Sequence, residues 1–167
     1  QIIIIPNDIP PHKNADERNP LDVLQMLNLV FGGIEGFSVS TYELDKKGFS
    51  YSYETLEYFT KMNPNDEFYF IIGEDSYVDF SAWRNPERIL ELAKLVIFER
   101  KFYHEDKLKK AREFIKRTGN EEIFLNSLTL EISSRDIRER VRKGKEIGFL
   151  VPGEVKEYII GKGLYRK

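Results

Sequence analysis

The sequence contains no cysteine, and it has only one tryptophan and two histidines. Disulfide bonds, zinc–thiolate sites and thiol catalysis are therefore excluded. No apolar run approaches the roughly 18 residues of a membrane span, and no signal peptide is visible. Lys and Arg number 26 against 28 Asp and Glu, and this net charge of -2 gives no general attraction to nucleic acid or an anionic membrane. We expect a cytoplasmic protein with neither partner, in which any anion-binding site is local.

The composition is that of a globular protein, with 41% hydrophobic residues in a chain of 167. That length is enough for one domain with a real core. No cluster of His, Asp and Glu has the spacing of metal ligands, so we do not expect a metal cage built by the protein alone.

Predicted strands alternate with predicted helices along the whole chain. The run Ile2–Ile5 is typical of a strand buried on both faces of a parallel sheet. Further strands are predicted at residues 37–42, 68–72, 95–98 and 122–125. Of these, the strands at 68–72 and 95–98 are also predicted to be buried. Helices are predicted to follow Asn19 and Ser52 and to span residues 86–92, 104–118, 133–143 and 152–161. This alternation predicts an α/β fold, with a Rossmann-like, doubly wound parallel sheet in a single domain over residues 1–167.

Ligands of such sheets bind beyond the carboxyl ends of the strands, so the polar loops there are the candidate sites. Ser133 opens a predicted helix, and Asp136 completes a capping box. The free amides of a helix start, here at Ser133 and Ser134, can also bind phosphate, and Arg138 one turn later matches phosphate oxygens bidentately. The helix start alone, without a ligand, remains the alternative interpretation.

Two other loops carry groups suited to anions. His12 and Lys13 follow a rigid pair of prolines after the first strand, and Arg100 follows the strand at 95–98. Cations at the carboxyl ends of strands suit a phosphate, although exposed polar ends and a surface charge are the alternatives.

Gly73 and Asp75 follow the strand at 68–72, where an acid can accept hydrogen bonds from a ribose. The alternative for Asp75 is a helix cap at a turn. Trp83 lies among polar residues, which favours a platform for stacking a flat ring over a role in the core. The alternating charges of the helix at 104–118 are typical of a solvated face.

These features, in this order, resemble one family, the bacterial nicotinate mononucleotide adenylyltransferases of the His-x-Gly-His nucleotidylyltransferase superfamily. The segments that carry the resemblance are Ile-Pro-Asn-x-x-Pro-Pro-His-Lys at 5–13, Ser-Tyr-Ser-x-x-Thr-Leu at 50–56, Ile-Gly-x-Asp-Ser at 72–76 with Trp83, Ile-Ser-Ser-x-x-Ile-Arg at 132–138, Leu-Val-Pro at 150–152 and Gly-Leu-Tyr-Arg at 163–166.

The resemblance implies attack by the phosphate of nicotinate mononucleotide on the α-phosphorus of ATP, giving deamido-NAD and pyrophosphate. Mg²⁺ is expected to bridge the ATP phosphates. The implied catalytic residues are His12, Lys13 and Arg138. The implied ATP and phosphate contacts are Gly73, Asp75, Ser133, Ser134 and Arg138. The implied contacts of nicotinate mononucleotide are Tyr51, Ser52, Trp83 and Arg100.

The chain departs from the family pattern at several positions. Arg135 replaces a Ser or Thr, and Arg84 stands where an aromatic residue often follows the stacking tryptophan. A cation at Arg84 would favour nicotinate over nicotinamide. Neither His12 nor His104 has the His-x-Gly-His spacing, so we expect a strand and helix of about 25 further residues to precede Gln1 in the native protein.

Two other functions are kept as alternatives. Pantetheine-phosphate adenylyltransferase belongs to the same superfamily, but Trp83 and the Ser50-Tyr51-Ser52 segment count against it. The second alternative is a module that binds a nucleotide but does not catalyse a reaction. The sequence leaves a homo-oligomer open.

Overall fold

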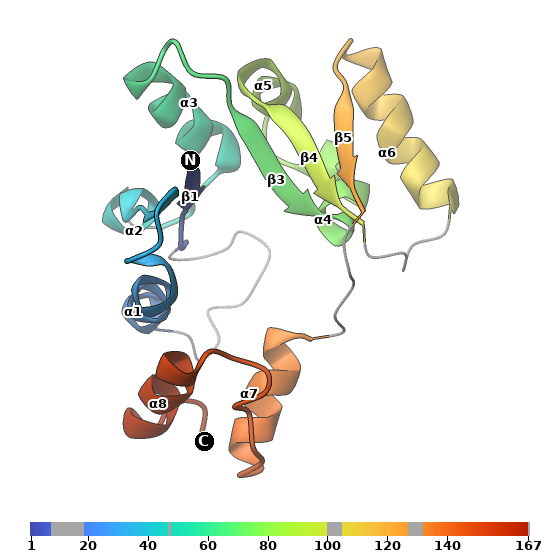
Figure 1. Ribbon diagram of the computed structural model, residues 1–167. Coiled ribbons are helices and arrows are strands. Elements are labelled where there is room, and N and C mark those ends of the chain that lie inside the picture. The colour runs from blue at the N-terminus through green and yellow to red at the C-terminus, as the bar shows by residue number, and fades with distance from the viewer. Residues whose placement is uncertain (8–18, 47, 100–104, 127–131, 167) are drawn as a thin grey trace. The chain divides into compact units, whose positions relative to one another are not determined.

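The computed structural model describes residues 1–7, 19–46, 48–99, 105–126 and 132–166 (Figure 1). The chain divides into two compact units, Gln1–Ser50 with Glu131–Lys167, and Tyr51–Leu130. His12, Lys13 and Arg100 lie outside the described residues. No helix of the described ranges is long and apolar enough to span a membrane.

The first unit contains a parallel pair of strands, β1 (Ile2–Ile4) and β2 (Phe37–Val39), with Ile2 opposite Phe37. The predicted burial of β1 on both faces is wrong, because Ile2 is 42% exposed. The predicted strand at 37–42 is too long, since the chain turns at Ser40 and a short helix, α2 (Tyr42–Lys46), begins. The hydroxyl of Ser40 accepts a hydrogen bond from the Tyr42 amide at 3.3 Å and so ends the strand.

Three longer helices complete this unit: α1 (Pro20–Phe31), α7 (Ser134–Arg142) and α8 (Gly153–Gly161). The Asn19 side chain accepts a hydrogen bond from the Leu21 amide at 3.0 Å, with Pro20 in the first helical position, as the sequence predicts. The Tyr158 hydroxyl of α8 donates to Asp22 of α1 at 2.7 Å. The buried residues of this small core are Ile147, Val155 and Ile159.

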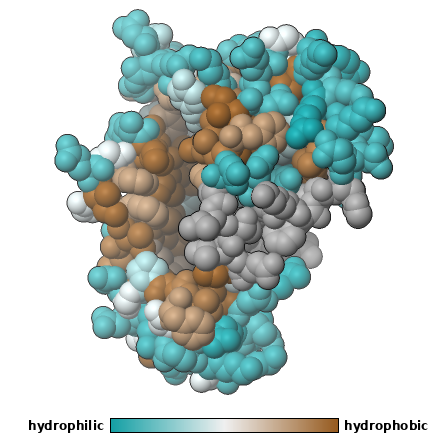
Figure 2. Space-filling model, turned by 45° about the vertical axis from the view of Figure 1, so that its right-hand side comes forward, coloured by the Kyte–Doolittle hydropathy of each residue, from teal (hydrophilic) through white to brown (hydrophobic). Residues whose placement is uncertain are grey.

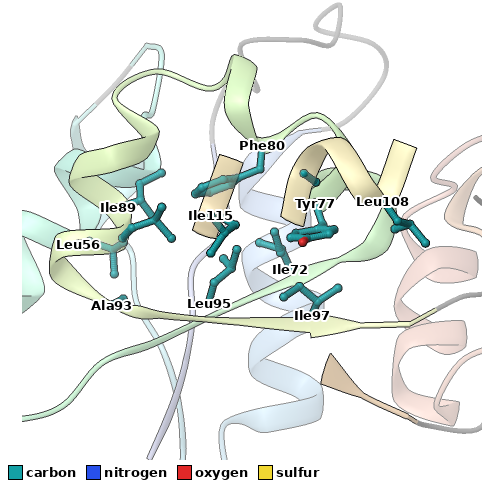
Figure 3. Packing of buried hydrophobic residues seen from close by; sticks show 12 residues of the cluster. Leu56, Ile72, Tyr77, Phe80, Ile89, Ala93, Leu95, Ile97, Leu108 and Ile115 are labelled. Atoms are coloured by element: carbon teal, nitrogen blue, oxygen red, sulfur yellow. The ribbon is translucent and has the colours of Figure 1, made fainter. Parts of the chain in front are cut away.

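The second unit is built on a parallel sheet with the order β3 (Tyr69–Gly73), β4 (Lys94–Phe98) and β5 (Glu122–Leu125). Its helices are α3 (Ser52–Met62), α4 (Glu74–Val78), the 3-10 helix η1 (Phe80–Ala82), α5 (Pro86–Leu92) and α6 (Glu105–Arg117). Apolar side chains of the helices and of alternate strand residues meet in one core (Figure 3). Tyr77, Ile97 and Ile115 are fully buried in it.

The parallel α/β, Rossmann-like class is confirmed, as are the helices that start at Pro20, Ser52 and Pro86. The prediction that the strand at 68–72 is buried is wrong in part, because Ile72 is buried but Tyr69 and Ile71 are 49% and 47% exposed. Within the described ranges the strands form two sheets, of two and three strands. The assignment of residues 1–167 to one domain stays a prediction.

A partly buried contact in the second unit gives a pH-dependent prediction. Glu122 accepts a hydrogen bond from the Tyr77 hydroxyl at 3.3 Å. Burial raises the pKa of Glu122 above its usual value, against the lowering effect of Tyr77 and Arg112. Because the folded protein holds this proton more tightly than the unfolded chain does, Glu122 contributes stability below the unfolded pKa that is lost as the pH rises through the folded pKa.

The Glu122→Gln variant should therefore gain stability over the wild-type protein as the pH rises from about 4 to 7. The free energy of unfolding in urea, measured at several pH values, tests this expectation. Exposed Glu121 is the matched control, and Glu121→Gln should show no such gain. A Glu122→Gln gain that is the same at every pH would contradict the proposed cause.

Candidate functional site

The start of α7, in the first unit, has the predicted capping box. The Ser133 hydroxyl accepts a hydrogen bond from the Asp136 amide at 3.0 Å and donates to the Asp136 carboxylate at 2.6 Å. This cap uses the Asp136 amide, and it leaves the amides of Ser134 and Arg135 as first-turn donors at the positive end of the helix dipole. The geometry therefore suits an anion, although the Asp136 carboxylate nearby opposes one.

Arg138 lies one turn further into α7 and is half-buried. Its guanidinium carbon lies 6.0 Å above the ring centre of Tyr165, which itself packs against the core of the first unit. This stacking restrains the guanidinium near the helix start. Arg135, in contrast, is exposed.

The start of α3, in the second unit, has no side-chain cap, because its N-cap residue is Tyr51. The amides of Ser52 and Tyr53 in the first turn are thus available as donors, whereas the Glu54 amide donates to the Tyr51 carbonyl at 3.0 Å. Just before them, Ser50 is 8% exposed, and its hydroxyl has no hydrogen-bond partner among the described residues. A buried hydroxyl without a partner is costly, so a ligand atom that accepts its proton would be favoured.

Trp83 ends η1 and is partly buried. Its ring centre lies 6.1 Å from Phe70 and 5.5 Å from Phe80, in edge-on and tilted contacts. Trp83 thus packs against the core as the alternative interpretation predicts, while part of its surface stays exposed. Its role as a stacking platform remains a prediction.

Arg84, next to Trp83, lies within electrostatic range of the first turn of α3. The pKa of Tyr53 is raised by burial and by its hydrogen bond to Glu54, and the positive charge of Arg84 acts against this rise. Tyr53 also stacks on Tyr51, with ring centres 6.1 Å apart. The positive charge of Arg84 therefore acts on Tyr53, in the first turn of α3.

Gly73 ends β3 and is the N-cap of α4, and Asp75 is exposed in the first turn of that helix. The alternative in which Asp75 caps the helix is wrong, since the helix begins at Glu74. Sequence reasoning passed over Glu74, which is only 3% exposed, and the hydroxyl of Ser50. The pattern of neighbouring residues gave no signal for either burial.

The described site residues belong to both units. Ser133, Ser134 and Arg138 lie in the first unit, and Tyr51, Ser52, Gly73, Asp75 and Trp83 lie in the second. Where the structure describes the chain, no group of three or more His, Asp or Glu side chains could hold a metal ion.

Comparisons with known proteins define the class. Residues 1–140 match the family described as cytidylyltransferase-like, which makes the chain a nucleotidyltransferase with a Rossmann-like sheet. A Clostridium botulinum (strain Alaska E43) protein is 38% identical over 169 residues, covering 100% of this chain and 84% of that protein. A Clostridium tetani protein is 36% identical over 168 residues, covering 99% and 84%. Both are named "Probable nicotinate-nucleotide adenylyltransferase". The chain belongs to the nicotinate-nucleotide adenylyltransferase family, as its resemblance implied.

Solved structures agree on the fold. The Plasmodium falciparum nicotinic acid mononucleotide adenylyltransferase complexed with NaAD matches with a TM-score of 0.73 and 20% identity, covering 99% of this chain and 82% of that one. The same enzyme complexed with APC matches with a TM-score of 0.66, covering 87% and 75%. At this identity the likeness supports the fold alone.

Proposed function

We propose that this protein transfers the adenylyl group of ATP to nicotinate mononucleotide in NAD biosynthesis. A phosphate oxygen of the mononucleotide attacks the α-phosphorus of ATP and forms a new P–O bond. The bond between the α-phosphorus and the oxygen that bridges it to the β-phosphorus breaks, and pyrophosphate leaves with the bonding electrons. The products are deamido-NAD and pyrophosphate.

The observation that carries the proposal in this chain is the start of α3, which has no side-chain cap and has Arg84 in electrostatic range. Donors and a cation together suit the carboxylate of a nicotinate ring. Trp83, the neighbour of Arg84, would stack on the pyridine ring, and Tyr51 and Ser52 would present the α3 amides to its carboxylate.

On the ATP side, the α7 start with Ser133 and Ser134 would hold phosphate oxygens, and Arg138 would neutralise charge that develops on pyrophosphate. Gly73 and Asp75 would contact the nucleotide at the end of β3. Mg²⁺ would enter with the ATP phosphates, since it commonly keeps several waters and few protein ligands. His12 and Lys13 would lie beside the phosphates, and Arg100 near the acceptor, as the family resemblance implies.

The experiment that tests the proposal measures products. The full protein is incubated with ATP and Mg²⁺ and with one acceptor at a time, namely nicotinate mononucleotide or 4′-phosphopantetheine. We expect equal amounts of pyrophosphate and deamido-NAD with the first acceptor only. Turnover of phosphopantetheine would establish the alternative transferase, and ATP binding without pyrophosphate release would establish the non-catalytic module.

Arg84→Ala should reduce the preference for nicotinate mononucleotide over its nicotinamide analogue by roughly tenfold, as expected for losing one hydrogen bond between charged groups. The analogue carries no carboxylate, so its kcat/KM should change little. Arg84→Lys keeps the charge and is the control, which should retain most of the preference. An unchanged preference in Arg84→Ala would discard this role.

Ser50→Ala should raise the KM for nicotinate mononucleotide by about 2–10-fold, the worth of one neutral hydrogen bond. Stability should not fall with it, because the variant removes a buried hydroxyl that has no hydrogen-bond partner among the described residues. Steady-state kinetics and urea unfolding check the two parts separately. A loss of stability with an unchanged KM would make Ser50 a packing residue.

A further inference from the structure

A groove of about 600 Å³ lies between α6 and η1 in the second unit. Its lining residues are Ser81 from η1 and Lys110, Glu113, Phe114, Lys116 and Arg117 from α6. The volume lies within the range of small-molecule sites. Figure 2 turns the α6 side of this unit forward and shows a largely hydrophilic surface there.

Some cations of the unit outside the groove are held in ion pairs. Arg112, on the same helix, pairs with Glu105 at 2.8 Å, and Arg88 pairs with both Glu57 and Glu91 at 2.8 Å. Lys110, Lys116 and Arg117 form no ion pair with any residue of the described ranges. Of the described residues that line the groove, only Glu113 carries a carboxylate, so a net positive charge faces the groove.

One cation of the groove, Arg117, packs against an aromatic ring. The guanidinium carbon of Arg117 lies 5.9 Å above the ring of Phe114. Phe114 in turn contacts Phe80 of the core edge-on, with ring centres 6.4 Å apart. A guanidinium positioned by a fixed ring loses little freedom when it binds an anion, and its donors match phosphate oxygens. The hydroxyl of Ser81, on the opposite wall, is a further donor.

We infer that this groove is a second anion site, which binds phosphate-bearing small molecules apart from the candidate residues of the transfer reaction. Phosphate is the group favoured by unpaired cations with a positioned guanidinium. Phe80 of the core packs against both Phe114 and Trp83, so the groove is anchored to the core of the second unit. The inference does not depend on the proposed reaction.

The test is a titration of the full protein with inorganic phosphate, and separately with AMP, followed by the amide NMR signals of Ser81, Lys110 and Arg117. We expect these signals to shift and saturate, and the affinity to fall at least roughly tenfold in the Lys110→Gln, Arg117→Gln double variant. The control is Lys109→Gln, which removes the same charge from α6 outside the groove and should leave the affinity unchanged. Lys110→Gln alone covers the case in which the double variant fails to fold.

The results separate the ligand's source. Equal affinity for phosphate and AMP identifies the phosphate group as the whole ligand, whereas tighter binding of AMP with a shift of the Phe114 ring signals identifies a nucleoside phosphate. No shift at Ser81, Lys110 and Arg117, or an equal loss of affinity in Lys109→Gln, overturns the inference. Turnover of ATP is measured in a separate assay, so failure of this site leaves the proposed reaction untouched.

Discussion

Replacing Arg138 with alanine should reduce kcat by about 10²–10³-fold, the effect of removing one preorganised donor that stabilises developing charge. Arg138 is half-buried in α7, with its guanidinium 6.0 Å above the ring of Tyr165. Such a side chain is already restrained before ATP binds, so in the proposed role its charge would stabilise the transition state without a large cost of ordering. Steady-state kinetics with saturating ATP and nicotinate mononucleotide measure the effect.

In the same variant the free energy of unfolding should fall by no more than about 1 kcal/mol, because a cation–π contact of a partly exposed arginine contributes about that much. Urea unfolding measures this loss independently of activity. A stability loss of several kcal/mol that accounts for the lower activity would instead assign Arg138 a structural role.

Arg135→Ala is the matched control for Arg138→Ala. Both residues lie in the first turns of α7, but Arg135 is exposed, and its removal should change kcat by about twofold or less, as expected for a screened surface charge. If the two variants lose activity equally, the general positive charge of the helix start is responsible, and the position of the Arg138 guanidinium is not.

The sequence predicted the elements whose apolar residues repeat clearly. In α6 the spacing of Leu108, Ala111 and Ile115 indicates a helix with one buried face, and all three are buried. The caps at Asn19 and Ser133 follow from short-range hydrogen bonds that the local sequence determines. The short helices α2 and α4 were not predicted, because five residues are too few to show a helical period.

Burial and juxtaposition were harder to predict than the elements themselves. The charges of α6 were interpreted as one solvated face, yet Lys110 and Arg117 line a groove because η1 lies opposite them. Only the tertiary fold brings Ser81 to that position. The isolation of the Ser50 hydroxyl likewise depends on which residues pack around it, and sequence spacing contains no information on that packing.

Trp83→Ala should have two effects, because the ring packs against the core and is proposed to stack on the pyridine ring. Loss of its contacts with Phe70 and Phe80 should lower the free energy of unfolding by about 3 kcal/mol, the low end for removing a large aromatic side chain, since Trp83 is only partly buried. Loss of stacking on the pyridine ring should raise the KM for nicotinate mononucleotide by about 2–10-fold, given the worth of an aromatic pair. Urea unfolding and steady-state kinetics measure the two effects.

Trp83→Phe separates these roles. A phenyl ring keeps an apolar contact with Phe80 and a surface for stacking, so this variant should recover most of the stability and part of the acceptor affinity. Trp83→Leu is the complementary control, since it retains apolar volume without an aromatic face. If Trp83→Leu binds nicotinate mononucleotide as well as Trp83→Phe does, the ring contributes packing alone, and the acceptor must be held by the α3 start and Arg84 without a stacking platform.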